Sequence, residues 1–204
     1  MLASAVDTWA TVAVAIGTIG AVAYALFRDL VVTPRRRPKL ELLFDPGSTD
    51  QVVIETAEGF DAPQVRLRVT NRTGKDTADD VVVMVTELRE LDGSDDPEVR
   101  PVGLPLTWSG SSPPLSVASV HPGSERHVDF LHVDRPAGDD AAVAPLRLDL
   151  TPKPTGSRDA LDAGTYEISI EVRARNADAI RYAIPVSWDG AWERVRIEPP
   201  RQVR

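Results

Sequence analysis

The residues Thr8–Phe27, TWATVAVAIGTIGAVAYALF, form a run of twenty residues without a charged side chain. A helix of about 20 residues rises about 30 Å, which matches the hydrocarbon thickness of a bilayer. Its polar groups are three threonines and the tips of Trp9 and Tyr24, too few for the polar face of a surface helix. Threonine hydroxyls can bond to the helix backbone and are tolerated in lipid. We therefore predict a single transmembrane helix over residues 8–27.

Two other interpretations of this run remain open, a buried core helix of a soluble domain and a cleaved signal peptide. Ala23-Tyr24-Ala25 has the small-x-small form of a cleavage site. Against cleavage, Met1–Asp7 contains no Lys or Arg, and the positive charge follows the apolar run instead of preceding it. Six alanines and two glycines also make membrane insertion only modestly favourable.

The basic residues near the run predict its orientation. Only the α-amino group and Asp7 carry charge before it, whereas five basic residues closely follow it. These residues are Arg28, Arg35, Arg36, Arg37 and Lys39. Basic residues close to a membrane helix stay on the cytoplasmic side. We therefore expect residues 1–7 outside, a basic Pro/Arg linker over residues 28–38 that is extended and stiff from Val32 to Pro38, and the remaining chain in the cytoplasm.

The composition limits the classes of partner. The chain of 204 residues has no cysteine, which excludes disulfides, thiolate metal sites and cysteine nucleophiles. Residues 39–204 contain 29 acidic and 19 basic residues, a formal net charge of −10. A domain of that charge is poorly suited to nucleic acid, whereas the basic linker suits anionic lipid headgroups. We expect the lipid bilayer and an unidentified protein as partners, and no nucleic acid.

Alternating hydrophobicity predicts strands in the remaining chain. Val65, Leu67 and Val69 share one strand face, and Gly164–Ala174 places four apolar side chains inside and four polar ones outside. The inside set is Tyr166, Ile168, Ile170 and Val172, and the outside set is Glu167, Ser169, Glu171 and Arg173. Further short strands are expected over 39–44, 51–55, 78–90, 104–108, 115–120, 126–133, 146–150, 181–188 and 192–197. Pro185 suggests an edge position or a bulge.

This pattern predicts an all-β, antiparallel immunoglobulin-like sandwich over residues 39–198, followed by a flexible tail, 199–204. RVTNRTGKDTADDVVVMV (Arg68–Val85) resembles the strand-turn-strand of CARDB-like and related immunoglobulin-like bacterial domains. LDAGTYEISIEV (Leu161–Val172) resembles the G-x-Y strand of the same sandwiches. With the N-terminal helix, the chain resembles bacterial single-pass membrane proteins that carry such a domain. The resemblance implies adhesion, spacing or partner binding.

The candidate reactive residues do not predict a catalytic or metal site. In a regular strand, His127 and Asp129 face one way and His132 and Asp134 the other, so these residues cannot converge on a metal. The loop residues Asp92, Ser94 and Asp96 lack the spacing of a calcium-binding EF-hand. Neither a G-x-S-x-G elbow nor a glycine-rich phosphate loop is present. Trp108, Trp188 and Trp192 are expected in the core or at a sheet edge. We predict no catalytic residues, no cofactor and no metal.

The sequence thus favours a non-enzymatic, membrane-tethered interaction module on the cytoplasmic face. The alternative is an exported, membrane-anchored adhesion or envelope domain. Ala13, Gly17, Ala21 and Ala25 recur every four residues and line one helix face, which would suit close packing of two helices in a homodimer. An alanine-rich helix can also produce such a stripe by composition alone.

Overall fold

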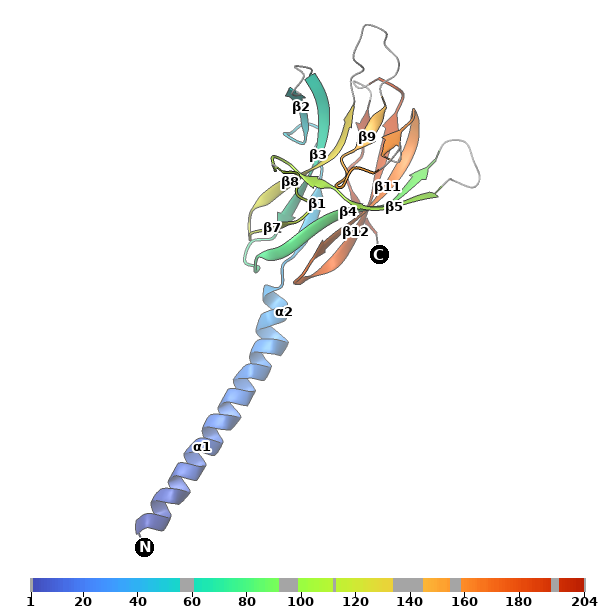
Figure 1. Cartoon of the computed structure of the whole chain (residues 1–204). Coiled ribbons are helices and arrows are strands. Elements are labelled where there is room, and N and C mark those ends of the chain that lie inside the picture. Colours follow the sequence, from blue (N-terminus) through green and yellow to red (C-terminus); the bar gives the residue numbers. More distant parts are fainter. Residues whose placement is uncertain are drawn as a thin grey trace. The chain divides into compact units, whose positions relative to one another are not determined.

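The computed structural model describes residues 2–55, 61–91, 99–111, 113–133, 145–154, 159–191 and 195–203. Contacts within the chain divide it into two compact units, Met1–Arg37 and Pro38–Arg204. The first unit is helical and the second consists of strands (Figure 1). The residues predicted at Asp92, Ser94, Asp96, Asp134 and Trp192 lie outside the described residues.

The helical unit is longer than the apolar run. Helix α1, Leu2–Phe27, continues into a π-helical turn, η1, Arg28–Val32, and then into α2, Thr33–Arg36. The expectation of an extended linker is therefore wrong as far as Arg36. Pro34 stands in the first turn of α2, where a helix tolerates a residue without an N–H. The Thr33 hydroxyl also donates a hydrogen bond to the carbonyl oxygen of Arg28, at 3.0 Å.

The apolar part of this helix has no protein covering it. Val14–Val32 is long and apolar enough to cross a membrane, and none of these residues is buried within the protein. Ile19, for example, is 70% exposed. A signal sequence near an N-terminus shares the same length and composition. The helix is thus a candidate membrane span.

Two antiparallel sheets make up the second unit. The first sheet has the order β1-β3-β8-β9-β10, with β2 paired to β3 and β6 paired to β8. Its strands are β1 Leu40–Leu43, β2 Gln51–Glu55, β3 Asp61–Asn71, β6 Thr107–Trp108, β8 Glu125–Val133, β9 Leu146–Leu148 and β10 Ala160–Leu161. The second sheet has the order β13-β12-β11-β4-β5, with β14 paired to β12 and β7 paired to β4. Its strands are β4 Ala78–Glu90, β5 Val99–Pro105, β7 Ala118–Val120, β11 Gly164–Ala174, β12 Ala177–Trp188, β13 Arg196–Ile197 and β14 Arg201–Val203. The predicted all-β sandwich is confirmed.

A single apolar core lies between the two sheets. The inward side chains of β3 and β11 are buried as the alternation predicts, and Trp108 of β6 is buried with them. Burying one large apolar side chain contributes roughly 1.5–3 kcal/mol. The inward faces of the long strands therefore provide the main stabilisation of the sandwich.

Several strand details differ from the sequence-based expectation. Glu171 was expected outside, but it is only 4% exposed because Arg173 and Arg181 cover its carboxylate. The tail beyond residue 198 is not loose, since it forms β14 against β12. Strand β5 begins at Val99 instead of residue 104, and β10 was not predicted.

Pro185 lies inside β12, which has neighbours on both sides. Strand β11 flanks one side of β12, and the short strands β14 and β13 flank the other. Strand β14 pairs as far as Ala183, and β13 begins to pair at Val186. Pro185 thus falls between the pairings of β12 with β14 and with β13, and its carbonyl accepts the N–H of Glu198 at 3.0 Å. The β11–β12 register shifts between Val172 and Ala174, so the predicted bulge is not at Pro185.

Candidate functional site

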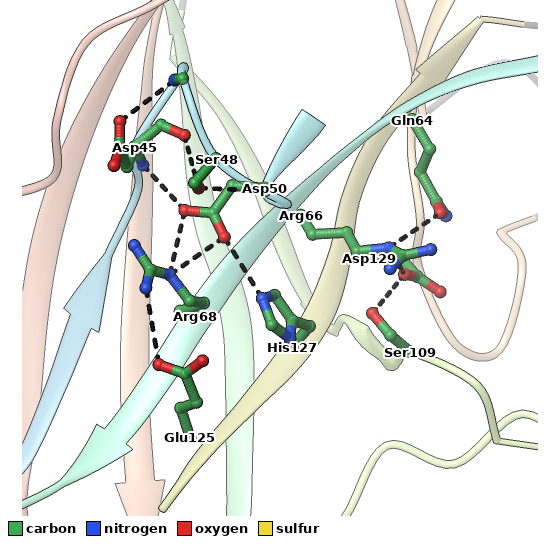
Figure 2. A network of polar contacts seen from close by, with 11 residues as sticks. Asp45, Ser48, Asp50, Gln64, Arg66, Arg68, Ser109, Glu125, His127 and Asp129 are labelled. Atoms are coloured by element: carbon green, nitrogen blue, oxygen red, sulfur yellow. Dashed lines mark hydrogen bonds and ion pairs between the residues drawn. The ribbon is translucent and has the colours of Figure 1, made fainter. Parts of the chain in front are cut away.

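The outer face of the first sheet carries two groups of polar side-chain contacts, which we name together the β3–β8 network (Figure 2). The backbone N–H of Arg66 joins the groups by donating a hydrogen bond to the carbonyl oxygen of Asp50, at 2.7 Å. Its members come from β3, β8, the β1–β2 connection and the segment after β6. They are Asp45, Ser48, Asp50, Gln64, Arg66, Arg68, Ser109, Glu125, His127 and Asp129. Because the inward residues of β3 fill the core, alternation sends Gln64, Arg66 and Arg68 to this outer face.

A β-bulge in β8 changes which side chains share this face. Asp129 pairs with Arg66 and His132 pairs with Gln64, with a register shift between these two pairs. Phe130 and Leu131 are adjacent and both fully buried, so inward and outward side chains alternate regularly again only from Leu131 onward. His132 therefore lies on the same face as Asp129. The prediction that these residues point in opposite directions is wrong, because it assumed a regular strand.

Asp50 is the buried centre of the network. Its side chain is 0% exposed, and its carboxylate accepts the Asp45 N–H at 2.8 Å. The Arg68 Nε lies 3.0 Å from Oδ1 of Asp50, and the His127 Nε2 lies 3.2 Å from the same oxygen. A buried carboxylate is costly unless it is paired and hydrogen-bonded. Oδ2 of Asp50 accepts hydrogen bonds from Asp45 N–H and, at 3.1 Å, from Arg68 Nε, whereas Oδ1 lies near Arg68 and His127 without a hydrogen bond. Asp50 thus holds the β1–β2 connection against β3 and β8.

Asp129 lies at the other end of the network, next to Asp149. The Ser109 hydroxyl donates to Asp129, and the Arg66 Nε lies 3.5 Å from the same carboxylate. Burial raises the pKa of Asp129, and the Asp149 carboxylate adds to the increase, while Ser109 and Arg66 oppose it. Asp149 is contacted by His132 Nδ1 at 2.9 Å and by Gln64 Nε2 at 3.4 Å.

The network does not assemble a nucleophile with a base. Ser109 donates to a carboxylate, and Ser48 donates to the carbonyl oxygen of Asp45 at 2.8 Å, so neither serine donates to a histidine. A hydroxyl–imidazole contact joins Thr77 and His121 at 3.2 Å in an exposed position. The described residues also contain no group of three or more His, Asp or Glu placed to hold a metal. The arrangement can present charge to a partner and can position a loop.

Trp108 and Trp188, two of the three tryptophans predicted in the core or at a sheet edge, lie in the core. Trp108 and Trp188 are buried among residues of both sheets, which excludes an open aromatic cage formed by these two rings. The guanidinium carbon of Arg126 lies 5.3 Å from the Trp108 ring centroid, a cation–π contact.

A cavity that the sequence did not predict lies beside β5. Its volume is about 340 Å³, and its described lining is Arg100, Pro101, Val102, Leu104, Leu150 and Pro154. The strand expected from the sequence starts only at residue 104, so Arg100, Pro101 and Val102 lie outside the expected strands. The sequence signal for an earlier start of this strand is the pair of apolar residues two positions apart, Val102 and Leu104.

The residues predicted for the membrane helix are placed as follows. Gly17, Ala21 and Ala25 are exposed on α1, and a Cβ added at Gly17 would meet no atom within 4 Å. The side chain of Ala13 lies outside what the structure describes. The predicted orientation residues, Arg28, Arg35, Arg36, Arg37 and Lys39, are all exposed. Helix–helix contact and orientation both remain predictions.

Comparisons with known proteins leave the family open. No protein-family model matches the sequence, and no curated protein matches it. Among solved structures, the chain is similar to one described as the archaeal flagellum of Methanospirillum hungatei strain JF1, with 12% identity and a TM-score of 0.44. That match covers 94% of this chain and 91% of the other. A likeness at this level carries no inference about function, and the resemblance to CARDB-like domains has no family model behind it.

Proposed function

We propose that this protein is a single-pass, membrane-tethered, non-enzymatic interaction module whose sandwich lies on the cytoplasmic face. One observation carries the proposal: an apolar helix with no protein covering it belongs to a different compact unit from the folded sandwich. An apolar helix of that length needs a bilayer or a partner to cover it. The basic residues that follow the span favour the cytoplasmic orientation.

The β3–β8 network is the proposed partner-binding face. It presents cationic and anionic side chains on rigid strands, held in place by the buried Asp50. Such a face suits a folded protein with complementary charges, since charge pairing at an interface gives specificity. The formal charge of −10 on the sandwich makes nucleic acid an unsuitable partner.

Topology reporters fused after Arg204 test the orientation. A reporter active only in the cytosol should work, and one active only outside the cell should not. Replacing Arg35, Arg36 and Arg37 with glutamine should weaken this preference. The matched control replaces three exposed arginines of the sandwich, Arg72, Arg175 and Arg201, and should leave the preference unchanged. If the reporter works only outside the cell, the cytoplasmic proposal is wrong and the exported adhesion alternative applies.

Site-specific photocrosslinking in cells tests the proposed face. A photoreactive residue at the exposed Glu125, within the network, should give a protein adduct of one defined mass. The same residue at Arg201, on the edge of the second sheet, serves as the matched control and should not give that adduct. Equal adducts from both positions would contradict a face-specific partner.

A further inference from the structure

The cavity beside β5 opens at the edge of the second sheet. Strand β5 pairs with β4 on one side and is the last strand of that sheet's order. Its register places Arg100 opposite Leu88 and Leu104 opposite Val85, and both β4 residues are buried core residues. Arg100 and Leu104 therefore lie on the inward face of β5. Leu150 also lines the cavity, and it forms an isolated antiparallel β-bridge with Leu106.

The backbone of β5 explains why the space is not closed by tight packing. The register with β4 shifts between Val85 and Glu87, and Gly103 sits opposite this irregularity with a φ of +65°. Only glycine adopts that conformation without strain, and a bulge bends the strand that carries it. Pro101 also removes one N–H from the strand. These features keep β5 irregular next to the cavity.

Among the described residues that line the cavity, Arg100 is the one charged group. Arg100 is half-buried, and within the described part of the chain its guanidinium has neither a hydrogen bond nor an ion pair. Arg66, Arg68 and Arg89, by contrast, each have a carboxylate partner. A guanidinium withdrawn from water without a partner is unfavourable, and a carboxylate is the partner whose planar geometry fits it best.

We propose that the cavity binds a small carboxylate with an unbranched apolar chain. The chain would lie against Val102, Leu104 and Leu150, and the carboxylate would pair with Arg100. The volume, about 340 Å³, is at the lower end of the range for small-molecule sites, so the ligand is a short-chain acid. This site is independent of the β3–β8 network and of the orientation of the membrane helix.

Methyl NMR of the full chain in lipid nanodiscs tests the proposal. The probes are hexanoate, hexanol and hexylamine, which share one apolar chain and differ in the head group. Hexanoate should shift the methyl signals of Val102, Leu104 and Leu150 saturably, with a Kd at least tenfold lower than that of hexanol. Hexylamine should bind more weakly than hexanol, because Arg100 repels its charge. The methyl signals of Leu43 and Val203, which do not line the cavity, should not shift. They serve as controls for any effect of probe that dissolves in the lipid.

Two variants separate charge recognition from folding. In Arg100→Gln, the Kd for hexanoate should become about equal to the Kd for hexanol, while hexanol still binds. A methyl spectrum like that of the wild type would show that the variant is folded. Arg89→Gln, which removes a paired arginine from the neighbouring strand β4, should keep the full preference.

Four results would overturn the proposal. These are unshifted cavity methyls, equal affinities for hexanoate and hexylamine, and an unchanged preference in Arg100→Gln. The fourth is a shift of the cavity methyls with protein concentration in the absence of probe, since a second copy would then occupy the cavity.

A tripeptide ending in a free leucine carboxylate is included as a further probe. If it shifts these methyls and hexanoate does not, the small-acid proposal is wrong.

Discussion

The backbone N–H of Leu42 donates a hydrogen bond to the hydroxyl of Tyr182, at 3.2 Å, and joins the two sheets. Leu42 lies on β1, the edge strand of the first sheet, and Tyr182 lies on β12 of the second. An edge strand leaves N–H groups without a strand partner, and a buried N–H without an acceptor is unfavourable. The tyrosine therefore satisfies an edge donor and closes the sandwich at this side.

We predict that Tyr182→Phe lowers the free energy of unfolding by about 1–3 kcal/mol, because the Leu42 N–H is left buried without an acceptor. Urea denaturation measures this change. Tyr24→Phe, in the membrane helix, is the control and should leave the midpoint unchanged.

Tyr182 should also add alkaline sensitivity. Burial raises the pKa of Tyr182, the Glu41 charge adds to the increase, and the bond from Leu42 opposes it. A raised tyrosine pKa means that its stabilisation is complete below the unfolded value, about 10, and is lost as the pH rises through the higher folded value. The stability of the wild type should therefore fall more steeply than that of Tyr182→Phe above pH ~10.

Glu171 should add stability that acid removes. The hydrogen bond from Arg173 lowers the pKa of Glu171, and Arg181 adds to the decrease against the opposing effect of burial. A lowered carboxyl pKa gives stabilisation that is present above the unfolded value and is lost as the pH falls through the folded value. Glu171→Gln should therefore reduce the loss of stability below about pH 4.5 in acid-titrated urea denaturation. A steeper loss in the variant than in the wild type would contradict this assignment.

Asp129 should behave in the opposite way. Its raised pKa means that its protonated form favours the folded state, so its contribution is lost as the pH rises through the folded value. Asp129→Asn should therefore flatten the decline of stability between pH ~4 and the folded pKa, while the amide oxygen can still accept from Ser109. Urea midpoints across this range provide the measurement. Asp162→Asn, outside the network, is the control substitution.

The membrane helix is predicted to self-associate through its small-residue face. Gly17→Ile should reduce the signal in a membrane-helix association assay several-fold, because the larger side chain prevents close approach of two backbones. Ala15→Ile makes a comparable change on the opposite face and should leave the signal unchanged. Equal signals from Gly17→Ile and the wild type would show that the stripe reflects composition alone.

A fragment of residues 38–204 should fold without the helix, because contacts make it a separate compact unit. Its far-ultraviolet circular dichroism should be dominated by β-structure. A fragment ending at residue 198 should remain β-rich but unfold at a lower urea concentration, since it lacks the pairing of β14 with Arg181, Tyr182 and Ala183. A helical spectrum from the longer fragment would contradict the autonomous sandwich.

Local pattern was sufficient for much of this molecule. A long apolar run indicates a candidate span, although the span found, Val14–Val32, differs from the predicted residues 8–27 and includes Arg28 and Asp29. The inward faces of β3 and β11 follow from alternation, because both patterns depend only on neighbouring residues. The same reasoning placed His132 on the wrong face, because one extra residue in β8 reverses every later side chain. The adjacent apolar pair Phe130-Leu131 was the one sequence signal of that bulge.

Tertiary structure alone decided the remaining features. Asp50 becomes a buried centre only when β3 and β8 bring Arg68 and His127 to it, and these partners are distant in sequence. Residues 201–203 form β14 because the edge of β12 leaves backbone groups to pair. Glu171 is buried because Arg181 comes opposite it on β12. In each case the energy comes from contacts between strands that the fold brings together, which no local period encodes.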